Sequence, residues 1–205
     1  MARIHIVGAS GSGTTTLGAA LAACLDHSHI DSDTIFWKPT DPPFTTRRSV
    51  EGRAALVAEL LPVSGQWVFS GSAVGWAGAV EPFYDLIVFL KLDPSVRMER
   101  IRQREVVRYG ARIRAGGDMA EASAAFLDWT AAYDTAGLEQ RSLVKHEEWL
   151  ATQAAPVLRL DSAAPVEVLV AAVLKERCRR ISTDGQRINA GTKACSAASA
   201  SAAVC

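Results

Sequence analysis

Short apolar runs alternate along the chain with longer segments whose apolar residues recur every three or four positions. The short runs are typical of buried strands, and the longer segments are typical of helices. The predicted strands span residues 3–7, 27–31, 67–70, 86–92 and 157–160. The predicted helices span residues 14–25, 47–61, 94–108, 120–133, 138–151 and 165–179. Strands that alternate with helices predict an α/β protein with a parallel sheet covered by helices.

Two features of this pattern divide the chain. Pro39, Pro42 and Pro43 interrupt the connection after the second predicted strand, so that connection is expected to be a loop. From residue 181 the composition shifts to Ala, Ser, Gly and Thr. A chain of 205 residues is long enough for one sizeable core. We therefore expect one domain over residues 1–180 and a disordered Ala/Ser-rich tail over residues 181–205.

The strongest local signal is the glycine-rich segment GASGSGTT at residues 8–15, between the first predicted strand and the first predicted helix. Its glycines let successive backbone N–H groups turn inward, and the helix N-terminus adds free N–H groups and a positive dipole end. This context is that of a P-loop, in which a hydroxyl at the position of Thr15 ligates Mg²⁺. The predicted nucleotide-binding residues are Gly8, Ser10, Gly11, Ser12, Gly13, Thr14, Thr15 and Thr16.

The segment departs from a P-loop at one position, because Thr14 replaces the lysine that reaches the β- and γ-phosphates. Two other interpretations stay open. One is a tight strand-to-helix turn without a ligand. The other is a dinucleotide site, in which Asp33, 20 residues after Gly13, stands in the place of a ribose-binding acid. The glycine spacing and the lack of a Tyr-x-x-x-Lys pair count against the dinucleotide site.

Five segments carry a family resemblance: residues 8–17 (GASGSGTTTL), 31–33 (DSD), 41–47 (DPPFTTR), 70–72 (SGS) and 116–119 (GGDM). Together they resemble a group of bacterial adenylate-kinase-like P-loop proteins. More broadly, the chain is similar to nucleoside-monophosphate kinases and shikimate kinases over about residues 3–173. The close group also carries threonine in place of the lysine, so the resemblance implies that Thr14 is a trait of the group.

The resemblance implies a P-loop NTPase fold with a five-stranded parallel sheet of order 2-3-1-4-5, helices on both faces and an arginine-rich lid at about residues 105–120. It also implies transfer of the γ-phosphoryl group of ATP, bound with Mg²⁺, to a nucleotide, a nucleoside or another small hydroxyl compound. Two alternatives stay open. The missing lysine favours a nucleotide-binding regulatory protein or an ATPase without kinase activity, and the glycines with Asp33 favour a dinucleotide-dependent reductase.

Asp31 and Asp33 follow the second predicted strand, and in a strand their side chains point to the same face. Beside a P-loop, such a pair suits two tasks, which are holding Mg²⁺ and accepting the proton of an attacking hydroxyl. We expect Asp31 to join Thr15 at the metal, Asp33 to act as the catalytic base, and both acids to contact the acceptor substrate. The alternative is that one of them only caps a turn. His27 and His29 are expected to be strand residues.

Seven arginines but only two glutamates lie within residues 97–114. Arg97, Arg100, Arg104 and Arg108 are spaced by three or four residues and share one helical face. In the segment that the resemblance assigns to the lid, guanidinium groups would stabilise charge on the transferring phosphoryl. We therefore predict Arg100, Arg104 and Arg108 as catalytic residues that supply the charge missing at Thr14. A stripe that binds nucleic acid is the weaker alternative, because aromatic residues are not interleaved with these arginines.

Other residues near the predicted site have two interpretations each. Arg47 and Arg48 follow the proline-rich loop, where they either hold an anionic acceptor or begin an exposed helix. Trp37 and Trp76 either line the acceptor pocket or belong to the core. 

Two residues are expected to play no part in the site. Cys24 follows the apolar pattern of the first helix and is expected in the core, and His146 is expected on the surface.

The composition of the chain limits the classes of binding partner that we expect. The chain has 22 Lys and Arg against 22 Asp and Glu, so no global charge attracts nucleic acid or a membrane. Arginine makes up 17 of the 22 basic residues, which favours bidentate recognition of anions. No apolar run reaches the roughly 18 residues of a membrane span, and the four cysteines lack metal-binding spacing. We expect a cytoplasmic monomer or homodimer that binds ATP and a small-molecule acceptor, without nucleic acid or membrane partners.

Overall fold

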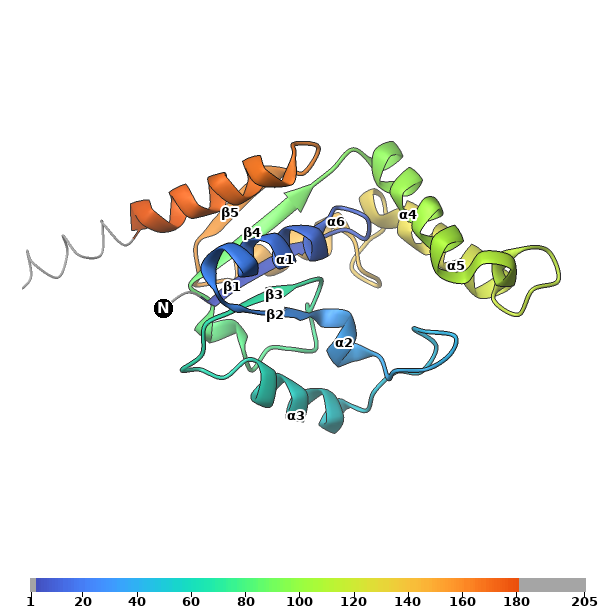
Figure 1. Ribbon diagram of the computed structural model, residues 1–205, viewed down its shortest axis with the longest axis horizontal. Coiled ribbons are helices and arrows are strands. Elements are labelled where there is room, and N and C mark those ends of the chain that lie inside the picture. Colours follow the sequence, from blue (N-terminus) through green and yellow to red (C-terminus); the bar gives the residue numbers. More distant parts are fainter. Residues whose placement is uncertain (1–2, 181–205) are drawn as a thin grey trace, which may run out of the picture. The chain divides into compact units, whose positions relative to one another are not determined.

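The computed structural model describes residues 3–180. A parallel five-stranded sheet of order β2-β3-β1-β4-β5 forms its centre (Figure 1). The strands are β1 (Arg3–Gly8), β2 (Ser28–Asp31), β3 (Trp67–Ser70), β4 (Leu86–Lys91) and β5 (Val157–Asp161). The predicted α/β class and sheet order are confirmed, and each predicted strand end lies within one residue of the observed one.

Helices flank this sheet, and most of them follow the predicted periodicity. The α-helices are α1 (Thr14–Leu25), α2 (Ser32–Phe36), α3 (Val50–Leu60), α4 (Pro94–Tyr109), α5 (Ala120–Ala131) and α6 (Leu143–Ala151). Three short 3₁₀ helices are η1 (Glu81–Phe83), η2 (Gly110–Ile113) and η3 (Ala132–Asp134). Residues 166–180 are helical as well.

Helices α3 and α6 begin three and five residues later than predicted. Serine hydroxyls set both starts, because Ser49 Oγ accepts the N–H of Gly52 and Ser142 Oγ accepts the N–H of Lys145. Serine is favoured at this position because its hydroxyl satisfies one of the free N–H groups of the first turn. The residues before each cap therefore lie in loops.

The short helix α2 is a feature that the sequence pattern does not predict. Asp31 is the last residue of β2, and its Oδ1 accepts the N–H of Asp33 at 2.9 Å, so Asp31 caps α2. Asp33 lies in the first turn of that helix. The prediction that both acids share one face of a strand is therefore wrong, because the strand ends at the cap.

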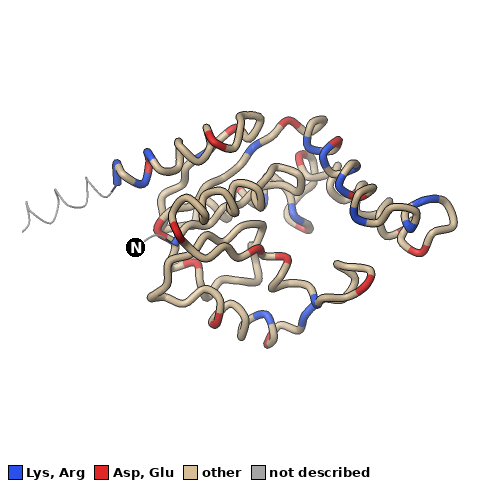
Figure 2. The backbone as a smooth tube through the Cα atoms, in the orientation of Figure 1, with Lys and Arg blue, Asp and Glu red and all other residues tan. Residues whose placement is uncertain are grey.

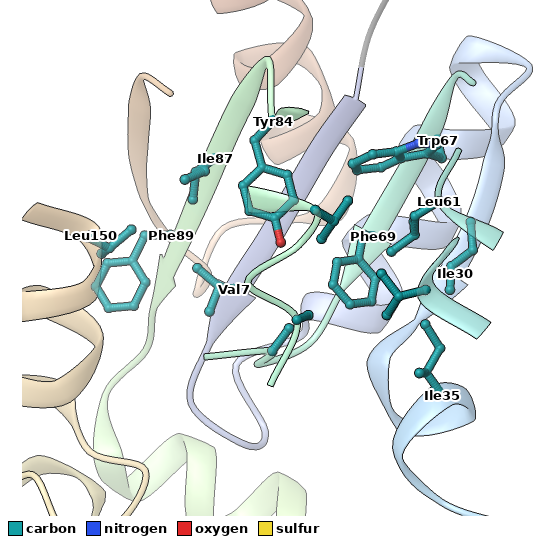
Figure 3. Packing of buried hydrophobic residues seen from close by; sticks show 14 residues of the cluster. Val7, Ile30, Ile35, Leu61, Trp67, Phe69, Tyr84, Ile87, Phe89 and Leu150 are labelled. Carbon is teal, nitrogen blue, oxygen red and sulfur yellow. The ribbon is translucent and has the colours of Figure 1, made fainter. Parts of the chain in front are cut away.

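Apolar side chains pack against both faces of the sheet. On one face, Val7, Phe69 and Phe89 belong to a cluster that also contains Leu150 of α6 (Figure 3). Alternate strand residues point the other way, and on that face α1 contacts β1, β2 and β3 and buries Leu17. The packed sheet leaves the carboxyl ends of its strands at one edge, where ligands bind in folds of this class.

The chain divides into two units. The larger unit, residues 1–170, contains the sheet and helices α1 to α6, and the smaller unit, residues 171–205, is helical over residues 171–180. The tail expected at residues 181–205 lies outside the described residues. Over residues 3–180, no helix combines the length and the apolar character that crossing a membrane requires.

Two predictions about single residues are wrong. Cys24 is exposed, because the buried face of α1 runs through Leu17 and Leu21 and Cys24 lies beside it. His146 is fully buried, because α6 turns it towards Tyr133 and away from solvent.

Candidate functional site

Residues 8–13 form a tight turn between β1 and α1. Gly11 and Gly13 have φ angles of +81° and +89°, a region that residues with a side chain rarely adopt. A Cβ on Gly11 would also lie 2.7 Å from the carbonyl oxygen of Arg97, so α4 packs directly behind this loop. Glycine is therefore required here both by backbone conformation and by space.

The loop presents free backbone N–H groups at the start of α1. Gly13 precedes the helix without any side-chain cap, and the first helical hydrogen bond runs from the Leu17 N–H to the Gly13 oxygen at 3.0 Å. The N–H groups of residues 14–16 thus have no partner within the helix. A Cβ on Gly13 would meet only Arg100 Nη1, at 4.0 Å. An anion can therefore approach these N–H groups.

All eight predicted nucleotide-binding residues line one large cavity, but their side chains differ in orientation. The Ser12 side chain is fully buried and its N–H donates to the Ala9 oxygen at 3.1 Å, so this residue shapes the loop. Ser10 faces the opposite way, and its Oγ accepts a hydrogen bond from Arg141 Nη1 at 3.4 Å.

Thr15 and Asp31, the two predicted magnesium ligands, lie in direct contact. Thr15 Oγ1 donates to Asp31 Oδ2 at 2.6 Å, and Ser70 Oγ at the end of β3 donates to the same oxygen at 3.3 Å. Strand β3 lies between β1 and β2, so the carboxylate reaches past the end of β3 to the start of α1. The first turn of α1 and the end of β2 thus form one polar cluster.

Asp33 is an exposed residue that lines the cavity. The protein around the cavity partly desolvates its carboxyl and raises its pKa, and the charge of Asp31 raises it further. Arg141, Arg104 and Arg108 act in the opposite direction. A carboxylate with a raised pKa is a better proton acceptor than an ordinary aspartate.

The predicted arginine face of α4 is divided between structure and cavity. Basic residues follow α4 along its length (Figure 2). Arg97 is fully buried, its Nη2 donates to Asp134 at 2.5 Å, and its guanidinium lies 5.0 Å from the centroid of the Tyr133 ring. Arg100 and Arg104 line the cavity, and no carboxylate of residues 3–180 lies within 4 Å of either guanidinium. These two arginines therefore remain available to an anion.

Arg108 also lines the cavity, but its guanidinium already has partners. It lies 3.7 Å from Glu105 and 4.2 Å from the centroid of the Phe44 ring. Of the three predicted catalytic arginines, Arg108 is thus the one whose charge is partly compensated within the protein.

Arg141 faces the cavity as well, and the sequence pattern missed it. Its guanidinium lies 5.1 Å from the centroid of the Trp129 ring and donates to Ser10 Oγ, and no carboxylate of the described chain lies within 4 Å. Burial lowers its pKa, while Asp33 raises it. The helix predicted over residues 138–151 concealed Arg141, although Ser142 is a favoured N-cap that would have placed Arg141 in a loop.

Aromatic side chains complete the cavity. Trp37 and Phe44 come from the proline-rich loop, and Phe126 and Trp129 come from α5. Trp76 does not line the cavity but packs at the edge of the core cluster. Of the two tryptophans considered from the sequence, only Trp37 therefore belongs to the site.

Arg47 and Arg48 line the cavity in different roles. The Arg48 guanidinium donates to the carbonyl oxygens of Ile35 and Trp37, at 3.1 and 3.3 Å, and so holds the proline-rich loop. Arg47 lies 5.9 Å from the centroid of the Trp37 ring and hydrogen-bonds no carboxylate in the described chain. Of the two guanidinium groups, that of Arg47 is thus more available to a ligand.

The proline-rich loop also contacts the segment after α4. Tyr109 Oη donates to the Pro43 oxygen at 3.0 Å. Arg112 forms ion pairs with Asp118, within its own segment, and with Asp41 at 2.6 Å across the cavity mouth. Arg112 itself does not line the cavity, so its role is to connect the two segments.

The cavity enclosed by these elements has a volume of about 1850 Å³. Pockets for one drug-sized ligand measure roughly 300–1,000 Å³. The phosphate loop borders one end, and Asp33, the arginines and the aromatic residues border the rest. The space is therefore sufficient for two small molecules side by side.

The order of the strands tests the interpretation of the glycine-rich segment and Asp33 as a dinucleotide site. In a dinucleotide-binding fold, the strand that carries the ribose-binding acid lies next to the strand before the glycine turn. Here β3 separates β2 from β1. The structural basis for a dinucleotide-dependent reductase is therefore absent from this sheet.

Comparisons with known proteins give one close sequence relative. The chain is 42% identical over 171 residues to YqaC of Bacillus subtilis (strain 168), described as an uncharacterized protein. The match covers 83% of this chain and 94% of YqaC. No protein-family model matches the chain.

Solved structures resemble the chain at lower identity. Shikimate kinase from Bacteroides thetaiotaomicron is 19% identical with a TM-score of 0.50, covering 85% of this chain and 97% of the kinase. A gluconokinase from Sinorhizobium meliloti 1021 is 18% identical with a TM-score of 0.48, covering 87% and 92% of the two chains. The likeness to shikimate kinase shows the fold, which is the P-loop kinase fold.

Proposed function

The chain belongs to the same family as YqaC of Bacillus subtilis. We propose that this chain is an ATP-dependent phosphotransferase. It transfers the γ-phosphoryl group of ATP to a small acceptor, which is a nucleotide, a nucleoside or another small hydroxyl compound. This proposal keeps the adenylate-kinase-like resemblance of the sequence and rests on the geometry of the cavity.

The observation that carries the proposal is the arrangement of opposite chemistries around one cavity. Free N–H groups of residues 14–16 border the cavity, and Asp33 lines the same cavity together with Arg104 and Arg141, whose charges act on it. Phosphoryl transfer requires a phosphate cradle, positive charge near the transferring group and a group that orients or deprotonates the acceptor. The cavity contains a candidate for each requirement.

The ATP phosphates bind at the loop end of the cavity. The N–H groups of residues 14–16 and the positive end of the α1 dipole attract them, as in other anion sites at helix N-termini. Because Gly13 leaves the space above the loop open as far as Arg100 Nη1, the phosphates approach the backbone closely.

Thr15 and Asp31 fit a magnesium ion bound with ATP. Mg²⁺ is held by one or two carboxylates or hydroxyls together with phosphate oxygens and water. Thr15 Oγ1 and Asp31 Oδ2, 2.6 Å apart, supply such a set. Residues 3–180 contain no group of three or more His, Cys, Asp and Glu that could hold a metal without ATP. When bound, the ion neutralises charge on the β- and γ-phosphates.

The positive charge near the transferring phosphoryl comes from arginines, since Thr14 supplies none. Arg141 contacts Ser10 of the loop and acts on the charge of Asp33, so it lies between the donor and acceptor ends. Arg100 and Arg104 add charge from α4. A guanidinium binds phosphate oxygens through two parallel N–H groups, which a lysine cannot do.

Asp33 is the proposed base. It accepts the proton of the acceptor hydroxyl as that oxygen forms a bond to the γ-phosphorus, while the bond from the γ-phosphorus to the bridging β–γ oxygen breaks and ADP leaves. Trp37 and Phe44 favour an acceptor with a planar ring, and Arg47 favours an acceptor with a negative charge.

Transfer of the terminal phosphoryl group tests this proposal. Purified full-length protein is incubated with ATP, Mg²⁺ and a panel of nucleosides, nucleotides, sugars and antibiotics, while ADP release and ³¹P spectra are recorded. We expect ADP release that depends on one class of acceptor, together with a new phosphoester signal. Release of inorganic phosphate alone, without a phosphorylated acceptor, would contradict the proposal.

A second candidate is a nucleotide-binding protein or an ATPase without kinase activity. Thr14 favours it, because the loop lacks the lysine found in P-loops. This candidate predicts that ATP binds but that no compound of the panel stimulates ADP release.

A further inference from the structure

Three buried polar side chains form a continuous chain that ends at the cavity. Ser72 Oγ lies 2.9 Å from His146 Nε2, and Tyr133 Oη lies 2.7 Å from His146 Nδ1. The exposed fractions of the three residues are 8%, 0% and 6%. Of the three, Ser72 lines the cavity, at the carboxyl end of β3. The chain therefore connects the packed interior to the ligand space.

The central residue, His146, is neutral. Burial, together with the nearby charge of Arg141, lowers the pKa of His146 to about 3. A neutral imidazole has one nitrogen that donates and one that accepts a hydrogen bond. The direction of the whole chain is thus decided by the nitrogen that carries the proton.

Tyr133 decides that direction. In the described part of the chain, its hydroxyl has His146 Nδ1 as the only hydrogen-bond partner. Its charged neighbours are the carboxylates of Asp134 and Glu147 and the guanidinium groups of Arg97 and Arg141. Among residues 3–180, neither carboxylate hydrogen-bonds the hydroxyl. Guanidinium groups donate hydrogen bonds and do not accept them. A buried hydroxyl proton without an acceptor is costly, so Tyr133 donates to Nδ1.

The position of the proton on His146 decides where the hydroxyl proton of Ser72 points. Because Nδ1 accepts from Tyr133, the imidazole proton lies on Nε2 and is donated to Ser72 Oγ. Ser72 Oγ then cannot donate its own proton back to His146, and no other described residue hydrogen-bonds this oxygen. The hydroxyl proton of Ser72 is therefore directed into the cavity.

The surroundings of Ser72 place this donor next to the segment of Asp31 and Asp33. The neighbouring Gly71 packs against the segment that carries both acids, since a Cβ there would lie 3.0 Å from Ser32 Cβ and 3.7 Å from Asp31 Oδ1. A hydroxyl that must donate requires an oxygen that accepts, such as that of a phosphate, a carboxylate or a carbonyl group. Water bound to Mg²⁺ donates its protons and does not meet this need.

We propose that Ser72 is a binding residue that donates a hydrogen bond to an oxygen of the acceptor substrate, and that Tyr133 and His146 are positioning residues that fix the direction of this bond. The inference rests on the proposed function for the identity of the ligand. Ser72 is not a nucleophile, because within residues 3–180 no carboxylate hydrogen-bonds His146 to stabilise an imidazolium ion.

The first test reads the direction of the chain in the protein without ligand. Full-length protein labelled with ¹⁵N-histidine is studied by two-dimensional ¹H–¹⁵N NMR between pH 5 and 9. The proposal predicts that His146 carries its proton on Nε2 throughout, with Nδ1 unprotonated. A proton on Nδ1, or on both nitrogens, would overturn it. This result does not depend on phosphotransfer activity, so it separates a failure of the inference from a failure of the proposed function.

The second test uses the panel compound that releases ADP fastest. Ser72→Ala is expected to raise the KM for that compound about tenfold and to change kcat little, as expected for loss of a hydrogen bond to a charged oxygen. Tyr133→Phe is expected to raise the same KM about threefold or more, because Ser72 can then donate to His146 instead. The double variant is expected to match Ser72→Ala, because both changes act through one hydrogen bond.

Tyr84→Phe is the matched control. Tyr84 is buried to the same extent as Tyr133, but among residues 3–180 its hydroxyl has no hydrogen-bond partner and it does not line the cavity. We expect a KM for the acceptor within about twofold of the wild-type value, since no hydrogen bond is lost. If Tyr133→Phe behaves like Tyr84→Phe while Ser72→Ala raises the KM, His146 does not direct the serine. If Ser72→Ala has no effect, the serine does not bind the acceptor.

Discussion

The phosphate loop and the arginine wall are two regions of one cavity that are built in opposite ways. The loop, residues 8–16, is one short segment that presents free backbone N–H groups and carries no charged side chain. The arginine wall is Arg100, Arg104 and Arg141, which come from α4 and from the loop before α6. The proposed phosphate cradle is thus neutral, and the positive charge of the cavity comes from other elements.

This difference has a functional consequence. In a P-loop with its lysine, the cradle and the charge move together because they belong to the same segment. Here the charge lies on elements that also contact the proline-rich loop, through the Arg112–Asp41 ion pair and the stacking of Arg108 on Phe44. The arginines of the α4 segment are thus connected to the proline-rich loop, which in the proposed function borders the acceptor.

Asp33→Asn gives the largest expected effect at the acceptor end. It removes the base and is expected to lower kcat by about 10³-fold while leaving ATP binding at the loop unchanged. Asp33 is exposed to the cavity, so its replacement by Asn is expected to change the Tm little. Steady-state kinetics and thermal unfolding at pH 7 check both expectations. A lower Tm with full activity would show that Asp33 is structural.

Arg104→Ala tests the arginine wall. Arg104 lines the cavity without a carboxylate partner, and kcat is expected to fall roughly tenfold or more when this positive charge is lost. Arg102→Ala on the same helix is the matched control, because Arg102 is exposed and does not line the cavity. Equal kinetics for both variants would remove Arg104 from the site.

The pH dependence of kcat tests the electrostatic coupling between Asp33 and the arginines. A base is active as the carboxylate, so kcat falls as the pH drops through its pKa. Partial desolvation raises that pKa, and the acidic limb is therefore expected above the ordinary aspartate value of about 3.9. Because Arg104 lowers the Asp33 pKa, the limb is expected at higher pH in Arg104→Ala and unchanged in Arg102→Ala. If the acidic limb of the kcat profile does not move in Arg104→Ala, Arg104 does not act on the pKa of Asp33.

Asp41→Asn gives the smallest expected effect. It removes one partner of the exposed ion pair between Arg112 and the proline-rich loop, while Asp118 still binds Arg112. Exposed ion pairs contribute little, so the KM for the acceptor is expected to rise about twofold, with no change in the KM for ATP. A rise in the KM for ATP instead would show that the Arg112–Asp41 ion pair affects nucleotide binding and not acceptor binding.

The same two regions differ in how well the sequence predicts them. The loop and the five strands were predicted because glycine spacing and short apolar runs are local signals. The acid pair was identified correctly as a pair of residues near the loop, but its geometry was wrong. The capping bond from the Asp33 N–H to Asp31 ends the strand, and this side-chain bond leaves no trace in the apolar pattern.

The arginine wall was predicted only in part. Spacing on one helix indicated Arg97, Arg100, Arg104 and Arg108 together. The fold, however, buries Arg97 in an ion pair with Asp134, 37 residues away in the chain. The sequence pattern missed Arg141 and placed His146 wrongly on the surface. Their roles depend on partners more than 70 residues away in the chain, which are Ser10 for Arg141 and Ser72 for His146. Contacts of this kind arise from tertiary packing and have no local signature.

The most direct test of the account is a charge exchange between the two regions. ATP turnover is measured for the wild type, Thr14→Lys, Arg141→Met and the double variant, with thermal unfolding to confirm that each folds. If Arg141 supplies the charge that the loop lacks, Arg141→Met lowers kcat about 100-fold, and adding Thr14→Lys restores a large part of it. Thr14→Lys alone does not raise turnover. Unchanged turnover in Arg141→Met, or a further loss in the double variant, would contradict the account.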